Sequence, residues 1–227
     1  MGVAGGPDPI VTDGLVFTID PANKRSYIPG SSTVFDMVGS NNGTLSNVSF
    51  RSENAVTWEM IRANNSEIDL GNSNILSPTS GDVSWCFWFN KHSATNTQAI
   101  FANWSSSNTQ YYLWFGYESN DNEMSIYLQD DKRMALPCPQ SQWHYVVITF
   151  QDGGSNPALI GYVNGVQEDT DTHNTLEGAH LDLSLGRDQN RNNHGSDSYY
   201  GPVHIYNRAL SAAEVLQNYN ALKDRFV

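Results

Sequence analysis

The stretch Trp143–Phe150 reads WHYVVITF, and after a short polar gap Leu159–Val166 reads LIGYVNGV. Val146–Thr149 is a continuous run of β-branched residues, which is typical of a buried strand. Asn164 and Gly165 form a dipeptide that favours a tight turn between two strands, because both residues tolerate positive φ. These stretches therefore predict a buried strand followed by a β-hairpin.

Further strand-like segments extend in both directions from this hairpin. Val83–Asn90 is apolar on both faces, which indicates a central strand, and Leu181–Leu185 alternates leucine with polar residues. Many short strands separated by turn residues predict an all-β sandwich. The other predicted strands are Gly14–Asp20, Glu67–Leu70, Ala99–Trp104, Tyr111–Tyr117, Met124–Gln129 and Tyr199–Tyr206, with short pieces near Gly43–Leu45 and Val48–Phe50.

One helix is expected, at the C-terminal end. Ser211 is a good N-cap, and Glu214 three residues later completes the pattern of a capping box. Leu210 and Val215 are spaced as a hydrophobic staple. The apolar residues of the segment fall at helical spacing and predict one stripe that packs on the sandwich, formed by Val215, Tyr219, Leu222 and Phe226.

Length and charge limit the classes of partner. The 227 residues fit one all-β domain and can bury a core without disulfides or metals. We expect residues 1–12, rich in glycine and proline, to form an extended N-terminal arm, and residues 13–227 to form the domain. A net charge of −12 argues against nucleic acid and anionic membrane surfaces as partners. The N-terminus lacks the basic and apolar regions of a signal peptide, so we expect synthesis in a cytoplasm, or prior removal of a leader.

The two cysteines do not form the pattern of a disulfide framework. Cys86 lies inside an apolar run and is interpreted as a small buried hydrophobic residue. Cys138 lies between two prolines in a predicted loop. Whether these cysteines pair is left open, because pairing depends on distances in the folded chain.

The hairpin resembles the corresponding hairpin of laminin-G-like domains, in which a Trp-His strand is followed by a Tyr-x-Asn-Gly turn. Leu183–Arg187 and Tyr200–Ser211 resemble the closing strand and helix of the same family. The resemblance implies a concanavalin A-like (laminin-G-like) jelly-roll β-sandwich with one short C-terminal helix. Pro202–His204 departs from the family pattern, which usually has an acidic residue there. The fold carries lectins, glucanases, adhesins and capsid parts, so the resemblance alone does not specify chemistry.

The N-terminal segment is similar to laminin-G-like proteins encoded by tailed bacteriophages. The similarity covers Pro9–Phe17, Asp20–Tyr27, Asp36 and Asn41–Leu45. It implies a virion structural protein, such as a capsid decoration (cement) protein or a head- or tail-fibre-associated protein. The implied partners are capsid or tail proteins of the same virion, and a homo-oligomer is expected because virion parts often sit on symmetry axes.

The sequence does not indicate an enzyme. A glucanase of this fold needs two carboxylates on one face of a strand. The nearest stretch, Glu118–Glu123, is polar throughout and is interpreted as a solvated turn. No Gly-x-Ser-x-Gly motif is present, and the histidines have no zinc-ligand spacing. His144 is interpreted as a strand residue.

Two binding hypotheses remain in addition to the virion structural role, namely Ca²⁺ binding and carbohydrate binding. Asp169, Thr170, Asp171, Asn174 and Glu177 offer oxygen ligands for Ca²⁺, although acidic turns facing water are the favoured interpretation. No other cofactor is predicted.

A carbohydrate-binding adhesin for host surface glycans is the main alternative function. Its sugar would stack on exposed aromatic rings beside amides, although core packing is the simpler role for any single ring. The candidate rings are Trp104, Tyr112, Trp114 and Tyr117.

Overall fold

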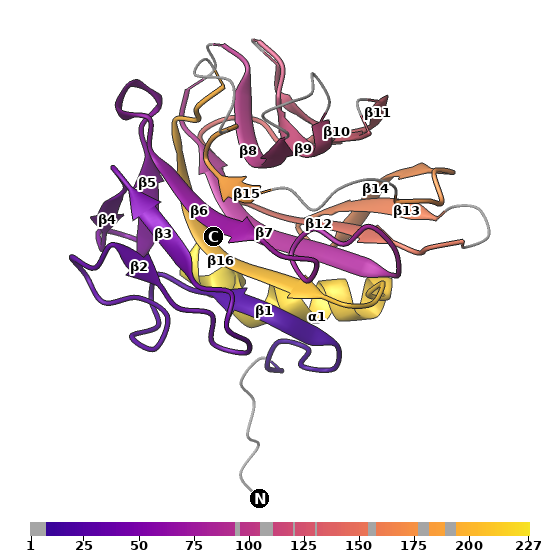
Figure 1. Ribbon diagram of the computed structural model, residues 1–227, viewed down its shortest axis with the longest axis horizontal. Coiled ribbons are helices and arrows are strands. Elements are labelled where there is room, and N and C mark those ends of the chain that lie inside the picture. Colours follow the sequence, from indigo (N-terminus) through magenta and orange to yellow (C-terminus); the bar gives the residue numbers. More distant parts are fainter. Residues whose placement is uncertain are drawn as a thin grey trace, which may run out of the picture.

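The computed structural model describes residues 8–93, 96–104, 111–119, 121–129, 131–153, 158–176, 182–188 and 194–227, with only the backbone described for Trp104, Tyr111 and Tyr112. Two antiparallel β-sheets are stacked as a sandwich, and one α-helix lies on the outer side of one sheet (Figure 1). This arrangement confirms the predicted all-β sandwich with a short C-terminal helix. In the described part of the chain, no helix is long and apolar enough to cross a membrane.

The sheet next to the helix, here called sheet A, has eight strands. Its order across the sheet is β14 (Val166–Asp171), β13 (Leu159–Val163), β12 (His144–Phe150), β7 (Val83–Lys91), β16 (Ser198–Tyr206), β5 (Thr57–Met60) and β4 (Ser49–Arg51), while β1 (Leu15–Ile19) pairs with one half of β16. The predicted turn joins β13 to β14, and both Asn164 and Gly165 have positive φ.

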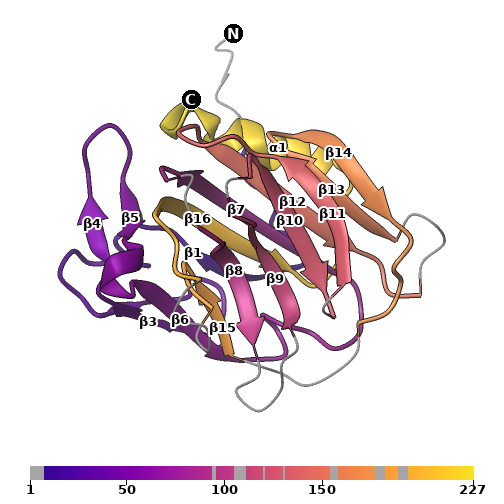
Figure 2. The same cartoon turned by 90° about the horizontal axis from the view of Figure 1, so that it is seen from above.

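Sheet B lies across the sandwich from sheet A (Figure 2). It also has eight strands. Its order is β11 (Asp131–Pro137), β10 (Glu123–Leu128), β9 (Tyr111–Tyr117), β8 (Gln98–Trp104), β15 (Asp182–Leu185), β6 (Glu67–Asn72), β3 (Gly43–Ser46) and β2 (Thr33–Val34). A single-turn 3₁₀ helix, η1 (Arg62–Asn64), precedes β6.

The main core lies between the two sheets. Phe87 of β7 stacks on Phe101 and Phe115 of sheet B, with ring centroids 5.5 Å and 6.3 Å away. Tyr117 and Cys138 also belong to this core. The described cysteines are both free and buried, and Cys86 faces the opposite side of sheet A, beneath the helix.

Helix α1 (Ala212–Leu222) continues into the 3₁₀ turn η2 (Lys223–Arg225) and covers part of the outer face of sheet A (Figure 1). The predicted capping box is present, because Ser211 accepts a hydrogen bond from the Glu214 amide and the Glu214 carboxylate accepts one from the Ser211 amide. All four residues of the predicted apolar stripe pack in a second apolar layer, between the helix and sheet A. Phe226 ends the layer by stacking on Trp88, at 4.6 Å between ring centroids.

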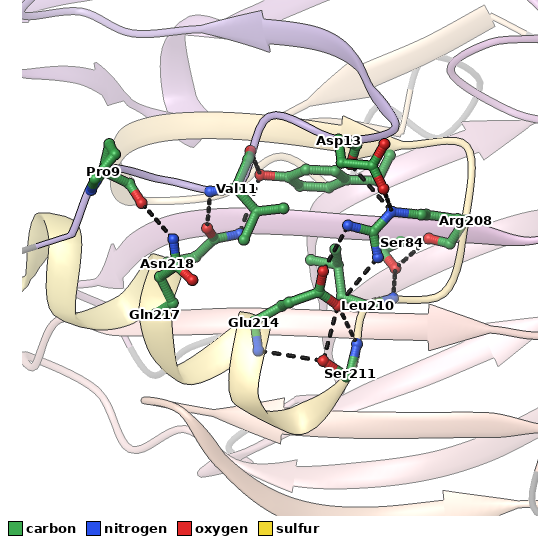
Figure 3. Close-up of polar contacts among 11 residues, drawn as sticks. Pro9, Val11, Asp13, Ser84, Arg208, Leu210, Ser211, Glu214, Gln217 and Asn218 are labelled. Atoms are coloured by element: carbon green, nitrogen blue, oxygen red, sulfur yellow. Dashed lines mark hydrogen bonds and ion pairs between the residues drawn. The ribbon is translucent and has the colours of Figure 1, made fainter.

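The described part of the predicted N-terminal arm lies along α1 (Figure 3). The Val11 amide donates to Asn218 Oδ1 at 2.7 Å, and Gln217 Nε2 donates to the Pro9 carbonyl at 2.7 Å. The Tyr206 hydroxyl donates to the Val11 carbonyl and accepts from Asn218 Nδ2. Residues 8–13, here called the strap, therefore belong to the folded domain. Residues 1–7 of the predicted arm are outside the described residues.

Three strands of the structure lie wholly outside the predicted segments, namely β2, β5 and β11. The hairpin strand β14 was predicted only at Val166 but extends to Asp171, so Asp169 and Asp171 lie in a strand and not in the acidic turn that was expected. In β11, Met134 and Leu136 are buried while the charged residues Asp131 and Lys132 are exposed. The charged start of the segment resembles a loop in sequence, but an edge strand can hold charged side chains in water.

Candidate functional site

A row of polar and aromatic side chains crosses the outer face of sheet A beyond the end of the helix. Tyr199 of β16 is paired with Glu59 of β5 on one side and with Asn90 of β7 on the other. Ser49 of β4 is paired with Glu59 and continues the row to the sheet edge. Trp143 directly precedes His144, the first residue of β12, which is paired with Phe89. The row therefore joins residues that are far apart in sequence.

Strand alternation explains why these side chains share a face. In β5, Trp58 and Met60 point into the core, so Thr57 and Glu59 point outward. In β7, Phe87 and Phe89 point into the core, so Trp88 and Asn90 point outward. Trp88 is covered by the helical segment, whereas Asn90 lies one position beyond it. Because the helical segment ends before it reaches Asn90, this part of the outer face of sheet A is accessible.

Three members of the row, Tyr199, Asn90 and Trp143, line a cavity of about 380 Å³. Its lining consists of Arg51, Glu53, Asn54, Ala55, Thr57, Asn90, Trp143 and Tyr199. Trp143 and Tyr199 are half-buried, so each ring has both a packed part and an accessible part. Small-molecule sites commonly combine such rings with a few polar groups that fix the orientation of the ligand.

Arg51 is held in place at one wall of the cavity. Its Nε donates to Glu59 Oε2 at 2.7 Å, and its guanidinium carbon lies 5.8 Å from the Tyr199 ring centroid. The hydrogen bond from Arg51 to Glu59, together with the charge of that carboxylate, raises the pKa of Arg51 above its ordinary value. Arg51 therefore stays cationic and keeps further N–H donors beside the cavity.

Trp143 and Asn90 also line the cavity. The Trp143 ring contacts Phe226 at 4.6 Å between centroids, so the C-terminal turn supports it from behind. Asn90 Oδ1 is buried and has no hydrogen-bond partner among the described residues. A buried acceptor left without a donor costs about 1–3 kcal/mol. Asn90 lines the cavity through its other atoms, because this oxygen itself is not accessible to a bound molecule.

The residues predicted as a sugar platform lie elsewhere. Trp114 of β9 is 2% exposed and packs against Ala99, Ala102 and Tyr127, and Tyr117 is fully buried between the sheets. The structure does not support these two rings as a sugar platform, because both faces of β9 are covered at these positions. The side chains of Trp104 and Tyr112, the other two candidates, are outside the described residues.

The acidic groups considered for Ca²⁺ are occupied by backbone contacts. Asp169 accepts hydrogen bonds from the amides of Ala135 and Thr170, and Asp171 accepts one from the amide of His173. Within the described residues, no group of three or more His, Cys, Asp or Glu side chains is placed to hold a metal. Glu177 is outside those residues, and the absence of a cofactor stays a prediction.

The stretch considered for catalysis, Glu118–Glu123, is a polar connection between β9 and β10, with residue 120 outside the described residues. The Glu118 carboxylate accepts hydrogen bonds from the Tyr127 hydroxyl at 2.7 Å and from Lys132 at 3.3 Å. The hydrogen bond from Tyr127, with further help from Lys132, lowers the pKa of Glu118. A carboxylate with a lowered pKa is a poor proton donor. The interpretation of the whole stretch as a solvated, non-catalytic turn stays a prediction.

Comparison with known proteins places this fold in a family. The family model described as Laminin_G_3, Concanavalin A-like lectin/glucanases superfamily, matches residues 62–216. The match covers more than half of the chain, and the chain belongs to this superfamily. No curated protein sequence matches it significantly.

Several solved structures share the fold. Trypanosoma rangeli sialidase in complex with sialic acid has a TM-score of 0.73 at 13% identity, over 99% of this chain and 37% of the sialidase chain. The botulinum neurotoxin serotype D/C binding domain has a TM-score of 0.69 at 15% identity, over 92% of this chain and 52% of its own. Another structure, of the botulinum neurotoxin DC binding domain with rat synaptotagmin II, gives 0.66 at 14% identity, with the same coverage. At these identities the likeness shows the fold alone.

The sequence alone does not predict that Arg51, Asn90, Trp143 and Tyr199 line one cavity. Trp143 was recognised as part of a strand motif, and Tyr199 as the start of the last strand. In β7, the available signal was Asn90, a polar residue at the next outward-facing position after Trp88. The pairing of β16 with both β5 and β7, which brings the row together, has no local signature in the sequence.

Proposed function

We propose that this chain is a non-catalytic carbohydrate-binding domain whose sugar lies against Tyr199 and Trp143. The observation that carries the proposal is the cavity of about 380 Å³ in which these two rings stand beside Arg51, Asn54 and Asn90. The C–H faces of a pyranose pack on aromatic rings, while its hydroxyls need donors and acceptors of the kind that arginine and asparagine supply.

Membership of the superfamily is compatible with this proposal but does not select it, because the superfamily name covers both lectins and glucanases. Binding without catalysis is favoured because Glu53 is the one carboxylate among the described residues that line this cavity, whereas the usual hydrolysis mechanism uses a pair, and Oε2 of the neighbouring Glu59 is engaged by Arg51. Glycoside hydrolysis requires one carboxyl group that is free to protonate the leaving oxygen. We therefore expect sugars to be recovered unchanged after incubation with the protein.

The proposal is tested by exposing the protein to an array of immobilised neutral and acidic glycans and measuring the hits by titration calorimetry. We expect Tyr199→Ala to lower the affinity at least tenfold, or about 1.4 kcal/mol. Tyr199→Phe keeps the ring and should bind nearly as well as the unchanged protein. Phe35→Ala removes an exposed ring, 41% accessible, that does not line the cavity, and serves as the control.

Two results would contradict the proposal. One is the absence of binding to any glycan at high protein density on the array. The other is an affinity that is unchanged in Tyr199→Ala while the variant retains its melting temperature. Chromatography of the sugars after long incubation tests the non-catalytic part separately, since a shortened product would indicate a hydrolase.

We propose further that the domain is carried on the virion of a tailed bacteriophage, as a capsid decoration protein or a fibre- or tail-associated protein. The supporting observation is the resemblance of residues 9–45 to phage-encoded laminin-G-like proteins. In the folded chain this stretch forms most of the strap together with β1, β2 and most of β3. A homo-oligomer bound to capsid or tail proteins would present the cavity to host surface glycans. Mass spectrometry of purified virions should find the chain in stoichiometric copy number, and its absence would contradict this role.

A further inference from the structure

A second cavity adjoins the first on the same face of sheet A. It measures about 340 Å³ and is lined by Ser49, Phe50, Arg51, Ser52, Glu53 and Glu59. Arg51 and Glu53 line both cavities, so the two are neighbouring compartments with these side chains between them. The compartment containing Tyr199 and Trp143 is here called the inner compartment, and the one at the sheet edge the outer compartment.

The position of Arg51 explains why the site is divided into two compartments. One side of its guanidinium faces the Tyr199 ring in the inner compartment, at 5.8 Å from the centroid. Its Nε is fixed to Glu59, which lines the outer compartment. The side chain is 47% exposed, so the guanidinium stands accessible between the two spaces. A guanidinium has five N–H donors, and one of them is committed to Glu59.

The charges of the two compartments argue against an acidic ligand. Arg51 contributes one positive charge, whereas Glu53 and Glu59 contribute two negative charges. Among the described residues that line the two compartments, Arg51 is the one cation, and the carboxylate of Glu59 already neutralises it. The whole chain carries a net charge of −12, which adds long-range repulsion of anions.

The volumes indicate the size of the ligand. Small-molecule sites commonly have volumes of about 300–1,000 Å³, so each compartment alone is at the lower end of this range. Each compartment is therefore large enough for at least one sugar unit. A linkage between two units would pass over Arg51, where the remaining N–H groups can donate to ring or linkage oxygens.

Resting on the proposed carbohydrate binding, we propose that this site takes a neutral oligosaccharide of at least two units, with one unit in each compartment and the linkage at Arg51. Glu53, which lines both compartments, is placed to accept hydroxyl hydrogen bonds from either unit. In this arrangement the outer compartment makes the affinity for a chain higher than the affinity for a single sugar. The inner compartment supplies the contact between the sugar and the aromatic rings.

The test is a set of calorimetric titrations with cello-, chito- and β-galacto-oligosaccharides of one to four units, with oligogalacturonides as the acidic comparison. We expect affinity in the binding series to rise at least tenfold between one unit and two or three units. The oligogalacturonides should bind more weakly than neutral oligomers of the same length. Equal affinity for the single sugar and its tetramer, or preference for the acidic series, would overturn the proposal while leaving carbohydrate binding intact. If none of these sugars binds, the oligosaccharide proposal is overturned, and the glycan array decides separately whether the proposed function also fails.

A variant isolates the outer compartment. Ser52 is exposed and lines only that compartment, so Ser52→Trp should fill it. We expect the affinity for the disaccharide to fall to that of the single sugar, while binding of the single sugar is unchanged. Ser40→Trp adds the same side chain at an exposed serine that lines neither compartment, and should behave like the unchanged protein. Retention of the full length dependence in a folded Ser52→Trp would contradict the assignment, and the titrations of the unchanged protein do not depend on how this variant folds.

Discussion

At the scale of single residues, a buried histidine makes folding sensitive to acid. His204 of β16 is buried beside β1, and its Nδ1 lies 2.7 Å from Thr18 Oγ1. Burial lowers the pKa of His204 to about 4, although the nearby carboxylate of Asp20 opposes the shift. In the unfolded chain the pKa is about 6.5. The folded state is therefore fully favoured above pH 6.5 and loses stability as the pH falls toward 4, because only the unfolded chain binds the proton readily.

We expect the free energy of unfolding to drop by about 2 kcal/mol between pH 6.5 and pH 5 on account of this residue. Burial also lowers the pKa of His144 and His173, so the total loss in acid is shared among several sites. Urea unfolding of His204→Gln at the two pH values should show a smaller loss than the unchanged protein. His92→Gln, at an exposed position, should leave the loss unchanged. Equal losses in His204→Gln and the unchanged protein would contradict this account.

At the scale of elements, the capping box stabilises the first turn of α1. Ser211 and Glu214 satisfy each other's backbone amides, and Arg208 holds the Glu214 carboxylate through two hydrogen bonds of 2.6 Å and 3.0 Å. The hydrogen bonds from Arg208 lower the pKa of Glu214 to about 2, so the box stays charged in mild acid. Ser211→Ala should lower the free energy of unfolding by about 1 kcal/mol, and Ser211→Thr by less, since threonine keeps the hydroxyl.

Chemical denaturation of these two variants checks the role of the cap. The exposed loop residue Ser40, changed to alanine, gives the background effect of losing a serine. A loss in Ser211→Thr as large as that in Ser211→Ala would indicate that packing at this position, and not the hydroxyl, is what matters.

Some elements of the fold could be predicted from the sequence, and others could not. The cap at Ser211 and the turn at Asn164–Gly165 were predictable, because both depend on residues that are neighbours in the chain. The central strand at Val83–Lys91 was predictable because both its faces are apolar. The edge strand at Asp131–Pro137 was not, since the water-facing part of an edge strand has the composition of a loop.

The candidate site was not predictable for a different reason. It depends on which strands pair and in which register, and one residue of slippage would move Tyr199 or Asn90 to the other face. The burial of Trp114 and Tyr117 was not predictable either, because alternation alone does not show that both faces of β9 are covered at these positions. The sequence could identify aromatic candidates, but only the pairing of β16 with β5 and β7 determines which rings meet.

At the scale of the whole molecule, the two ends of the chain are joined through the helix. Asn218 is fully buried, accepts from the Val11 amide at 2.7 Å and donates to the Tyr206 hydroxyl at 3.0 Å, while that hydroxyl donates to the Val11 carbonyl at 2.9 Å (Figure 3). This closed ring of hydrogen bonds links the strap, α1 and β16. The same helical segment ends at Phe226, which supports Trp143 at the candidate site.

Asn218→Leu keeps the approximate size of the side chain but leaves the Val11 amide and one side of the Tyr206 hydroxyl without a partner. Each such loss costs about 1–3 kcal/mol when the group stays buried, so we expect the strap to detach instead and expose these groups to water. Hydrogen exchange should then become fast at the Val11 amide, whereas amides of the central strand β12, such as Val147, should remain protected. Gln217→Ala, which removes only the contact to the Pro9 carbonyl, is the milder comparison and should leave Val11 largely protected. If Val11 and Val147 lose protection together in Asn218→Leu, the strap and the sandwich unfold as one unit. The ring of hydrogen bonds would then contribute to the global stability of the domain and would not hold the strap independently.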